Sequence, residues 1–316
     1  MNVLVTGACG LIGEKICSGI LKKENKVTAT DINPSEYNEG KVNYRFVQAD
    51  VYDRDVYDRL FKEEKFDVVV HCACTVDNDL GYIITEKEIK RSAVFDSFIY
   101  TSSVAAGVKK FILISTSQVY ELTKTREPIR ETDKLRLTTN YAKLKYDSER
   151  KLASSINKQT EMIAAVLRIA PIYTSSYLDN LINKILDSDE KMFVYRNGDY
   201  GFQFCCLHNL VDFILCFMKI AEDKKYIGIY NVSDPNIISV REIIKFARSK
   251  NKYGPVIQRN IGSDMVKAKL ARITDREQMK SNYRYNDLDT YFYNNVLDGT
   301  KSNSVCTFRW NIDNTK

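Results

Sequence analysis

The sequence predicts an α/β protein built on a doubly wound parallel sheet with a smaller C-terminal lobe. Apolar runs of strand length, such as 67–71 and 111–116, lack polar alternation, which is typical of parallel strands covered on both faces. Helical patterns of ten or more residues separate these runs in the first half of the chain. A glycine-rich turn joins the first run to the first helix, an arrangement common where such sheets bind ligands.

The expected elements alternate along the first half of the chain and become irregular later. Strands are expected at 3–6, 27–30, 44–47, 67–71, 111–116 and 163–169, with helices following Gly10 and at 53–64, 85–106 and around 141–145. Later helices are expected around 178–188, 209–221 and 239–249, and strands at 192–195 and 226–232. Residues 1–173 should form the sheet domain, with 202–233 returning to it, and 174–201 with 234–316 the smaller lobe. Residues 275–316 show no clear pattern.

The first turn carries Gly7, Gly10 and Gly13 in the spacing G-x-x-G-x-x-G. Gly7 can adopt the angles of a tight strand-to-helix turn, Gly10 lets the main chain approach a ligand, and Gly13 keeps the helix close to the strand. Free N–H groups and the dipole at the helix start would then bind a pyrophosphate. The spacing differs from the G-x-G-x-x-G of typical dinucleotide dehydrogenases. The turn therefore matches that motif in how it would bind a pyrophosphate, and not residue for residue.

The second strand ends at Asp31, 24 residues after Gly7. A carboxylate there accepts hydrogen bonds from an adenosine ribose 2′-hydroxyl and repels a 2′-phosphate. The sequence therefore predicts NAD rather than NADP. The alternative is a strand-ending Asp beside an ordinary glycine turn, but strand, turn, helix and acid follow one another in the order that a dinucleotide site requires.

Tyr141 and Lys145 are four residues apart and share one face of a predicted helix. A nearby ammonium, helped by a cationic nicotinamide ring, favours the tyrosinate that a base needs. Thr116 ends a buried strand, and the carboxyl ends of parallel strands meet at one edge, so its hydroxyl could bind the same substrate oxygen. The same Tyr and Lys spacing also occurs at Tyr37/Lys41 and at Tyr120/Lys124, but only Tyr141 follows that strand by a loop and opens a helix.

Composition excludes several other classes of protein. The net charge of +6 comes without a basic block, so nucleic-acid binding has no specific support. The eight cysteines form no C-x-x-C pair and only His71 and His208 are imidazoles, which predicts free thiols in a reducing cytosol and no metal site. There is no export-signal pattern and no apolar run of about 18 residues, so we expect a cytoplasmic protein without a membrane span.

Together these segments resemble the extended short-chain dehydrogenase/reductase family, and within it the NAD-dependent epimerase/dehydratase group that acts on nucleotide sugars. The resemblance runs from residue 1 to about 245 and rests on segments 6–13, Asp31, 49–51, 71–74, 114–120, 141–145 and 167–173. It implies a Rossmann fold, bound NAD and a possible homodimer, with Thr116, Tyr141 and Lys145 as catalytic hydroxyl, base and lysine. The implied cofactor contacts are Gly7, Cys9, Gly10, Leu11, Ile12, Gly13, Asp31, Asp50, Val51, Cys72, Ala73, Cys74, Ser92, Tyr141, Lys145 and Pro171.

The chain departs from the family pattern at several places. Ser92 stands where the family often has an Asn of a proton relay, and Pro171 replaces an Asn that commonly contacts the substrate diphosphate. Segment 202–209 lacks the usual Arg-Asp and Asp-Asp pairs. The half that binds the cofactor is therefore well matched, and the half that binds the nucleotide sugar is less so.

The resulting expectation is an NAD-dependent nucleotide-sugar epimerase or keto/hydroxyl oxidoreductase. Family members that act as 4,6-dehydratases carry an Asp-Glu pair where this chain has Ser117 and Gln118, so dehydration is disfavoured. Two alternatives stay open: a dehydrogenase or reductase for another small alcohol or ketone, and a non-catalytic NAD-binding regulatory protein.

Overall fold

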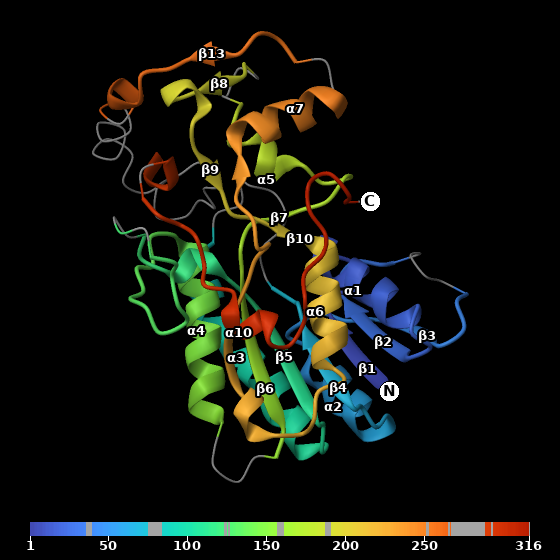
Figure 1. The fold of residues 1–316 in the computed structure, drawn as a ribbon. Coiled ribbons are helices and arrows are strands. Elements are labelled where there is room, and N and C mark those ends of the chain that lie inside the picture. Colours follow the sequence, from blue (N-terminus) through green and yellow to red (C-terminus); the bar gives the residue numbers. More distant parts are fainter. Residues whose placement is uncertain are drawn as a thin grey trace.

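A computed structural model describes residues 1–35, 40–74, 84–122, 125, 127–156, 161–186, 191–250, 253–264, 266, 288–291 and 293–315 (Figure 1). Seven strands form one sheet in the order β11-β6-β5-β4-β1-β2-β3, and every neighbouring pair is parallel. They are β1 (Asn2–Thr6), β2 (Lys26–Asp31), β3 (Tyr44–Gln48), β4 (Val68–His71), β5 (Lys110–Thr116), β6 (Ile163–Ile169) and β11 (Gly228–Val232). The predicted doubly wound parallel sheet is confirmed.

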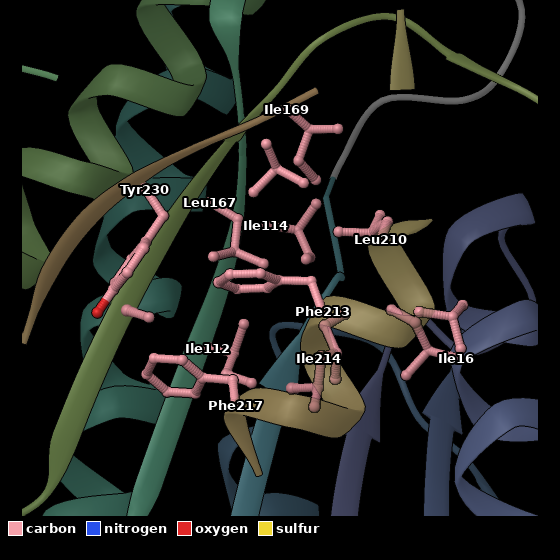
Figure 2. Close-up of a cluster of buried hydrophobic side chains, with 14 of the residues drawn as sticks. Ile16, Ile112, Ile114, Leu167, Ile169, Leu210, Phe213, Ile214, Phe217 and Tyr230 are labelled. Carbon is pink, nitrogen blue, oxygen red and sulfur yellow. The ribbon is translucent and has the colours of Figure 1, made fainter. Parts of the chain in front are cut away.

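Five helices cover the two faces of the sheet: α1 (Leu11–Leu21), α2 (Arg54–Glu63), α3 (Glu86–Ala105), α4 (Asn140–Ser155) and α6 (Leu207–Phe217). Successive residues of β1 point to opposite faces, so Val3 and Val5 pack in one core with α1 and α6, while Leu4 packs in the other with α2 and α3. Figure 2 shows the first core, where apolar side chains of β5 and β6 meet those of α6. Full burial of each such Leu, Ile or Phe contributes roughly 1.5–3 kcal/mol.

The order of the strands reverses at β1. The chain moves from β1 outward to β2 and β3, and then crosses back to place β4 on the other side of β1. The helices that follow β1 and β4 therefore leave in opposite directions and open a crevice at the carboxyl ends of these two strands.

The smaller lobe lies beyond this end of the sheet and has its own apolar cluster, which includes Phe202, Phe204 and Tyr291. It contains α5 (Asp179–Ile182), α7 (Val240–Lys250) and the short strands β7 (Ile172–Tyr173), β8 (Phe193–Val194), β9 (Gly201–Phe202), β10 (Cys205–Cys206), β12 (Ile238–Ser239) and β13 (Ile257–Gln258). The expected helix over 178–188 is wrong in length. The chain leaves the helix after Ile182, and Leu186 forms an antiparallel bridge with Met192.

The last segment of the chain contacts both halves of the molecule. Leu297 and Phe308 belong to the core of the sheet domain, and α10 (Thr300–Asn303) packs against β11. Ile312 belongs to the cluster of the lobe. The division into two domains, with 202–233 returning to the sheet domain and 234–316 in the lobe, stays a prediction.

A buried ion pair joins β5, β6 and α4. Arg168 Nη2 lies 2.7 Å from Glu149 Oε2, and both side chains are less than 5% exposed (3% and 4%). Arg168 Nε also donates to both carboxylate oxygens, at 3.2 and 3.1 Å. Ser115 Oγ donates to Glu149 from the end of β5. The pair therefore attaches α4 to the strand ends beside Thr116.

We expect Arg168→Ala to destabilise the protein by about 3–5 kcal/mol, because it leaves the Glu149 carboxylate buried without its cation. Arg150→Ala is the matched control, since Arg150 pairs with Asp147 on the exposed face of α4 and should lose less than about 1 kcal/mol. Urea unfolding of both variants measures the difference. Equal losses would contradict a structural role for the buried pair.

Candidate active site

A cavity of about 600 Å³ lies at the carboxyl ends of the central strands, where the strand order reverses. Most residues predicted for the cofactor and for catalysis line it: Gly7, Cys9, Gly10, Leu11, Ile12, Gly13, Asp31, Asp50, Val51, Cys72, Cys74, Thr116, Tyr141, Lys145 and Pro171. They come from segments that are distant in the sequence. The parallel sheet brings them together because it places all its strand ends on one edge.

The three glycines of the first turn serve different purposes. Gly7 has φ +68°, and a Cβ atom there would lie 2.6 Å from the backbone nitrogen of Ala73. A Cβ atom on Gly13 would lie 2.1 Å from the carbonyl oxygen of Gly7. At Gly10 the nearest atom would be 3.5 Å away, an ordinary contact. The fold thus requires Gly7 and Gly13, whereas Gly10 leaves room on the side of the cavity.

Asp31 connects the end of β2 to the glycine turn. Its Oδ2 accepts a hydrogen bond from the backbone N–H of Cys9 at 2.9 Å, and its Oδ1 accepts one from the N–H of Asn33 at 3.0 Å. Each carboxylate oxygen can accept more than one hydrogen bond, so these contacts leave capacity for ribose hydroxyls. The position at the rim of the cavity suits the predicted contact with the adenosine ribose.

Tyr141 and Lys145 lie near the start of α4, which Thr139 caps by accepting from the N–H of Ala142 at 3.0 Å. Lys145 Nζ donates to the carbonyl of Ile114 at 3.1 Å. Burial disfavours the charged form of Lys145, but its neighbours Cys74, Tyr141 and Asp96 outweigh burial and raise its pKa above the usual value. Lys145 is thus held as an ammonium beside Tyr141.

Burial raises the pKa of Tyr141 to about 12, although the charge of Lys145 acts to lower it. The ammonium of Lys145 therefore acts in the expected direction, against the larger effect of burial. Within the protein, desolvation of the phenolate is the larger effect. A second positive charge, such as the cationic nicotinamide ring, is needed to make Tyr141 a base near neutral pH.

Thr116 ends β5 and is 6% exposed. Its Oγ1 accepts from the N–H of Gln118 at 3.3 Å, and both residues line the cavity. The threonine hydroxyl is still a donor, so it can bind a substrate oxygen.

The competing tyrosines do not share this position. Tyr120 is 4% exposed and does not line the cavity, and its hydroxyl donates to Asn231 Oδ1 at 2.7 Å. Tyr37 and Lys124 lie outside the described residues. The structure places Tyr141, and not Tyr120, at the cavity.

Two residues predicted to contact the cofactor do not line the cavity, namely Ala73 and Ser92. Ser92 is buried in α3, and its neighbours Glu88 and Arg91 reach the cavity instead. The guanidinium carbon of Arg91 lies 3.4 Å from the centre of the Tyr52 ring. Glu88 and Arg91 are three residues apart and share one helix face. This spacing is the sequence feature that could have indicated that they reach the cavity together.

The lobe contributes Tyr177 and Asn180 to the cavity, and the sequence analysis missed both. Asn180 is 1% exposed, and its Nδ2 donates to the carbonyl of Ile172 at 2.7 Å. Its Oδ1 has no hydrogen-bond partner among the described residues. A buried acceptor of this kind is normally paired.

Within the described part of the chain, no helix is both long and apolar enough to cross a membrane. No group of three or more His, Cys, Asp or Glu side chains there is placed to hold a metal ion.

The model of the NAD dependent epimerase/dehydratase family matches residues 3–233. A mouse dTDP-D-glucose 4,6-dehydratase is 24% identical over 257 residues, which cover 77% of this chain and 71% of the mouse protein. UDP-glucose 4-epimerase of Bacillus subtilis (strain 168) is 27% identical over 177 residues, 53% of this chain and 52% of that protein.

Solved structures show the same fold. UDP-glucuronic acid 4-epimerase from Bacillus cereus, in complex with UDP-glucuronic acid and NAD, matches with a TM-score of 0.72 at 18% identity and covers 100% of this chain and 96% of that chain. The matched family is NAD-dependent, so NAD is the cofactor. The cavity fits it, since the turn at Gly10 leaves room at the start of α1 and no side chain caps that helix.

We expect Gly10→Ala to weaken NAD binding about 10- to 100-fold while the melting temperature stays close to that of the unaltered protein. The added methyl group meets no protein atom closely, but it fills space that a bound pyrophosphate needs. Calorimetric titration with NAD and thermal unfolding provide the two readouts. Gly13→Ala is the control, because its Cβ would collide with the Gly7 carbonyl and lower the melting temperature. Unchanged NAD affinity in Gly10→Ala would place the pyrophosphate elsewhere.

Proposed function

We propose that this chain, which belongs to the NAD-dependent epimerase/dehydratase family, oxidises and reduces a hydroxyl-bearing carbon of a nucleotide sugar. One observation carries the proposal. Thr116, Tyr141 and Lys145 line the same cavity as the glycine turn and Asp31. A hydroxyl, a phenol and an ammonium thus lie beside the place that suits the cofactor.

In this proposal the glycine turn holds the pyrophosphate of NAD and Asp31 holds its adenosine ribose. Bound NAD supplies an acceptor for hydride. Tyr141 Oη takes the proton from the substrate hydroxyl and gives it back in the reverse direction. Lys145 stabilises the phenolate as an ammonium, and Thr116 Oγ1 donates to the same substrate oxygen.

The raised pKa of Tyr141 makes the proton transfer depend on the cofactor. At neutral pH a phenol with a pKa near 12 keeps its proton and serves as an acid, which suits reduction of a ketone. Oxidation requires the phenolate, and a positive charge beside the ring lowers the pKa of Tyr141 toward that state. The site is therefore able to act in both directions.

Epimerisation or simple redox fits the residues around Thr116 better than dehydration. Gln118 lines the cavity next to Thr116, and Ser117 precedes it in the short 3₁₀ turn η1 (Ser117–Val119). An amide and a hydroxyl do not ionise near neutral pH, so they cannot remove water from a keto sugar as a carboxyl pair does. The mouse relative is named a dehydratase, which makes the reaction type a point for experiment.

A nucleotide sugar is the first choice of substrate because the Bacillus cereus neighbour is bound to UDP-glucuronic acid. Pro171 lines the cavity without a polar side chain, which favours the second candidate, another small alcohol or ketone. Placement of Thr116, Tyr141 and Lys145 in one cavity argues against a non-catalytic protein.

The reaction type can be tested by incubating the protein and NAD with UDP-, GDP-, dTDP- and CDP-hexoses and following product mass. We expect unchanged mass with a new stereoisomer, or a shift of two hydrogens, on at least one nucleotide sugar. Loss of one water would show a dehydratase. Turnover of none of the sugars would refute the nucleotide-sugar proposal.

The assignment of the base can be tested with Tyr141→Phe. We expect turnover to fall about 10²- to 10⁴-fold while NAD affinity is retained, because only proton transfer is removed. Tyr120→Phe is the matched control and should keep its turnover, since that hydroxyl is bonded to Asn231 away from the cavity. Full activity of Tyr141→Phe would exclude Tyr141 as the base.

A further inference from the structure

Asp96 is a buried carboxylate behind the cavity that the proposed mechanism does not use. It lies on α3 and is 6% exposed. We propose that Asp96 is a positioning residue that keeps Lys145 charged and holds α4 against the strand ends that carry the cofactor turn. The proposal rests on the proposed function for the role of Lys145.

One oxygen of Asp96 is connected to both strands at the crossover. Asp96 Oδ1 lies 2.8 Å from His71 Nε2, at the end of β4. The other ring nitrogen, His71 Nδ1, lies 2.6 Å from Thr6 Oγ1, at the end of β1. Thr6 Oγ1 also accepts from the backbone N–H of Ala73 at 3.3 Å. This chain of contacts runs from α3 to the residue directly before Gly7.

The second oxygen of Asp96 is connected to the catalytic helix. Ser148 Oγ donates to Asp96 Oδ2 and lies 3.1 Å from the carbonyl of Leu144 in its own helix. Ser148 follows Lys145 by three residues and Tyr141 by seven, so the three share one face of α4. Asp96 therefore fixes the rotation of the helix that presents Tyr141 and Lys145 to the cavity.

The protons of this network can all be assigned with a neutral histidine. Nε2–H of His71 donates to Asp96, and Nδ1 accepts from the hydroxyl of Thr6. Asp96 then receives one donor on each oxygen. In a buried setting a carboxylate acts strongly on a neighbouring ammonium.

Several groups act on Lys145 from the elements packed around it. They are Cys72 and Cys74 after β4, Tyr141 on its own helix, Asp96 on α3 and the carbonyl of Ile114 on β5. Among these groups Asp96 is the carboxylate. Burial lowers the pKa of Lys145, and Asp96 is one of the neighbours that raise it. Removing the charge of Asp96 should therefore let Lys145 lose its proton at a lower pH.

The test is the affinity for NAD between pH 6 and 11, measured by calorimetry without substrate. Asp96→Asn keeps the shape of the side chain and removes its charge. We expect the unaltered protein to keep its affinity up to pH 11, because the pKa of Lys145 is raised above its usual value, and Asp96→Asn to lose about tenfold affinity by that pH, because Lys145 binds NAD as an ammonium. Asp147→Asn is the matched control on the exposed face of α4 and should leave the curve unchanged.

Two further variants separate charge from position. Ser148→Ala keeps the carboxylate of Asp96, so its NAD affinity should hold to the same pH as in the unaltered protein. Its turnover should fall, because α4 loses a contact that fixes its position. Asp96→Ser is a second neutral variant for the case that Asp96→Asn does not fold, and it should show the same loss of affinity as Asp96→Asn. A folded neutral variant that keeps its NAD affinity to the same pH as the unaltered protein would overturn the proposal. If a neutral variant loses NAD affinity at a lower pH but the protein converts no nucleotide sugar, the role of Asp96 is supported and the proposed function is refuted.

Discussion

The close approach of three backbone segments at Gly7 and Gly13 is the constraint on which the cofactor half depends. Gly7 packs directly on Ala73 at the end of β4, and Gly13 packs on the carbonyl of Gly7. Because no side chain separates these segments, α1 begins beside the ends of β1 and β4. That contact places an uncapped helix start at the point where the strand order reverses.

The other half of the site depends on how α4 is held. Glu149 attaches it to β5 and β6 through Ser115 and Arg168, and Asp96 connects Ser148 to β4. Buried carboxylates are costly unless they are paired, and each of these has at least two donors. The same burial that makes these bonds strong also raises the pKa of Tyr141. The rigid placement of α4 and the raised pKa of Tyr141 thus have one physical origin, the burial of this part of the site.

Much of the site could be predicted from residues alone. The glycine turn, Asp31, Thr116 and the strands that carry them follow from local backbone requirements and from the rule that parallel strands end on one edge. The sequence could not show that Arg91 and not Ser92 lines the cavity, because neighbouring residues of a helix differ only in the direction in which they leave its axis. Asn180 was missed because it belongs to the lobe, where short elements have no periodicity.

Short-range features of the chain are enough to predict the parallel sheet, the glycine-rich turn and NAD as the cofactor, since these depend on apolar runs, glycine spacing and a strand-ending acid. The position of Tyr141 after a strand and loop already favoured it over Tyr120, and the tertiary structure adds the physical reason, since the Tyr120 hydroxyl is buried against Asn231 outside the cavity. The direction of the pKa shifts of Tyr141 and Lys145 also follows only from the tertiary structure, because pKa values depend on desolvation and on charges from distant segments.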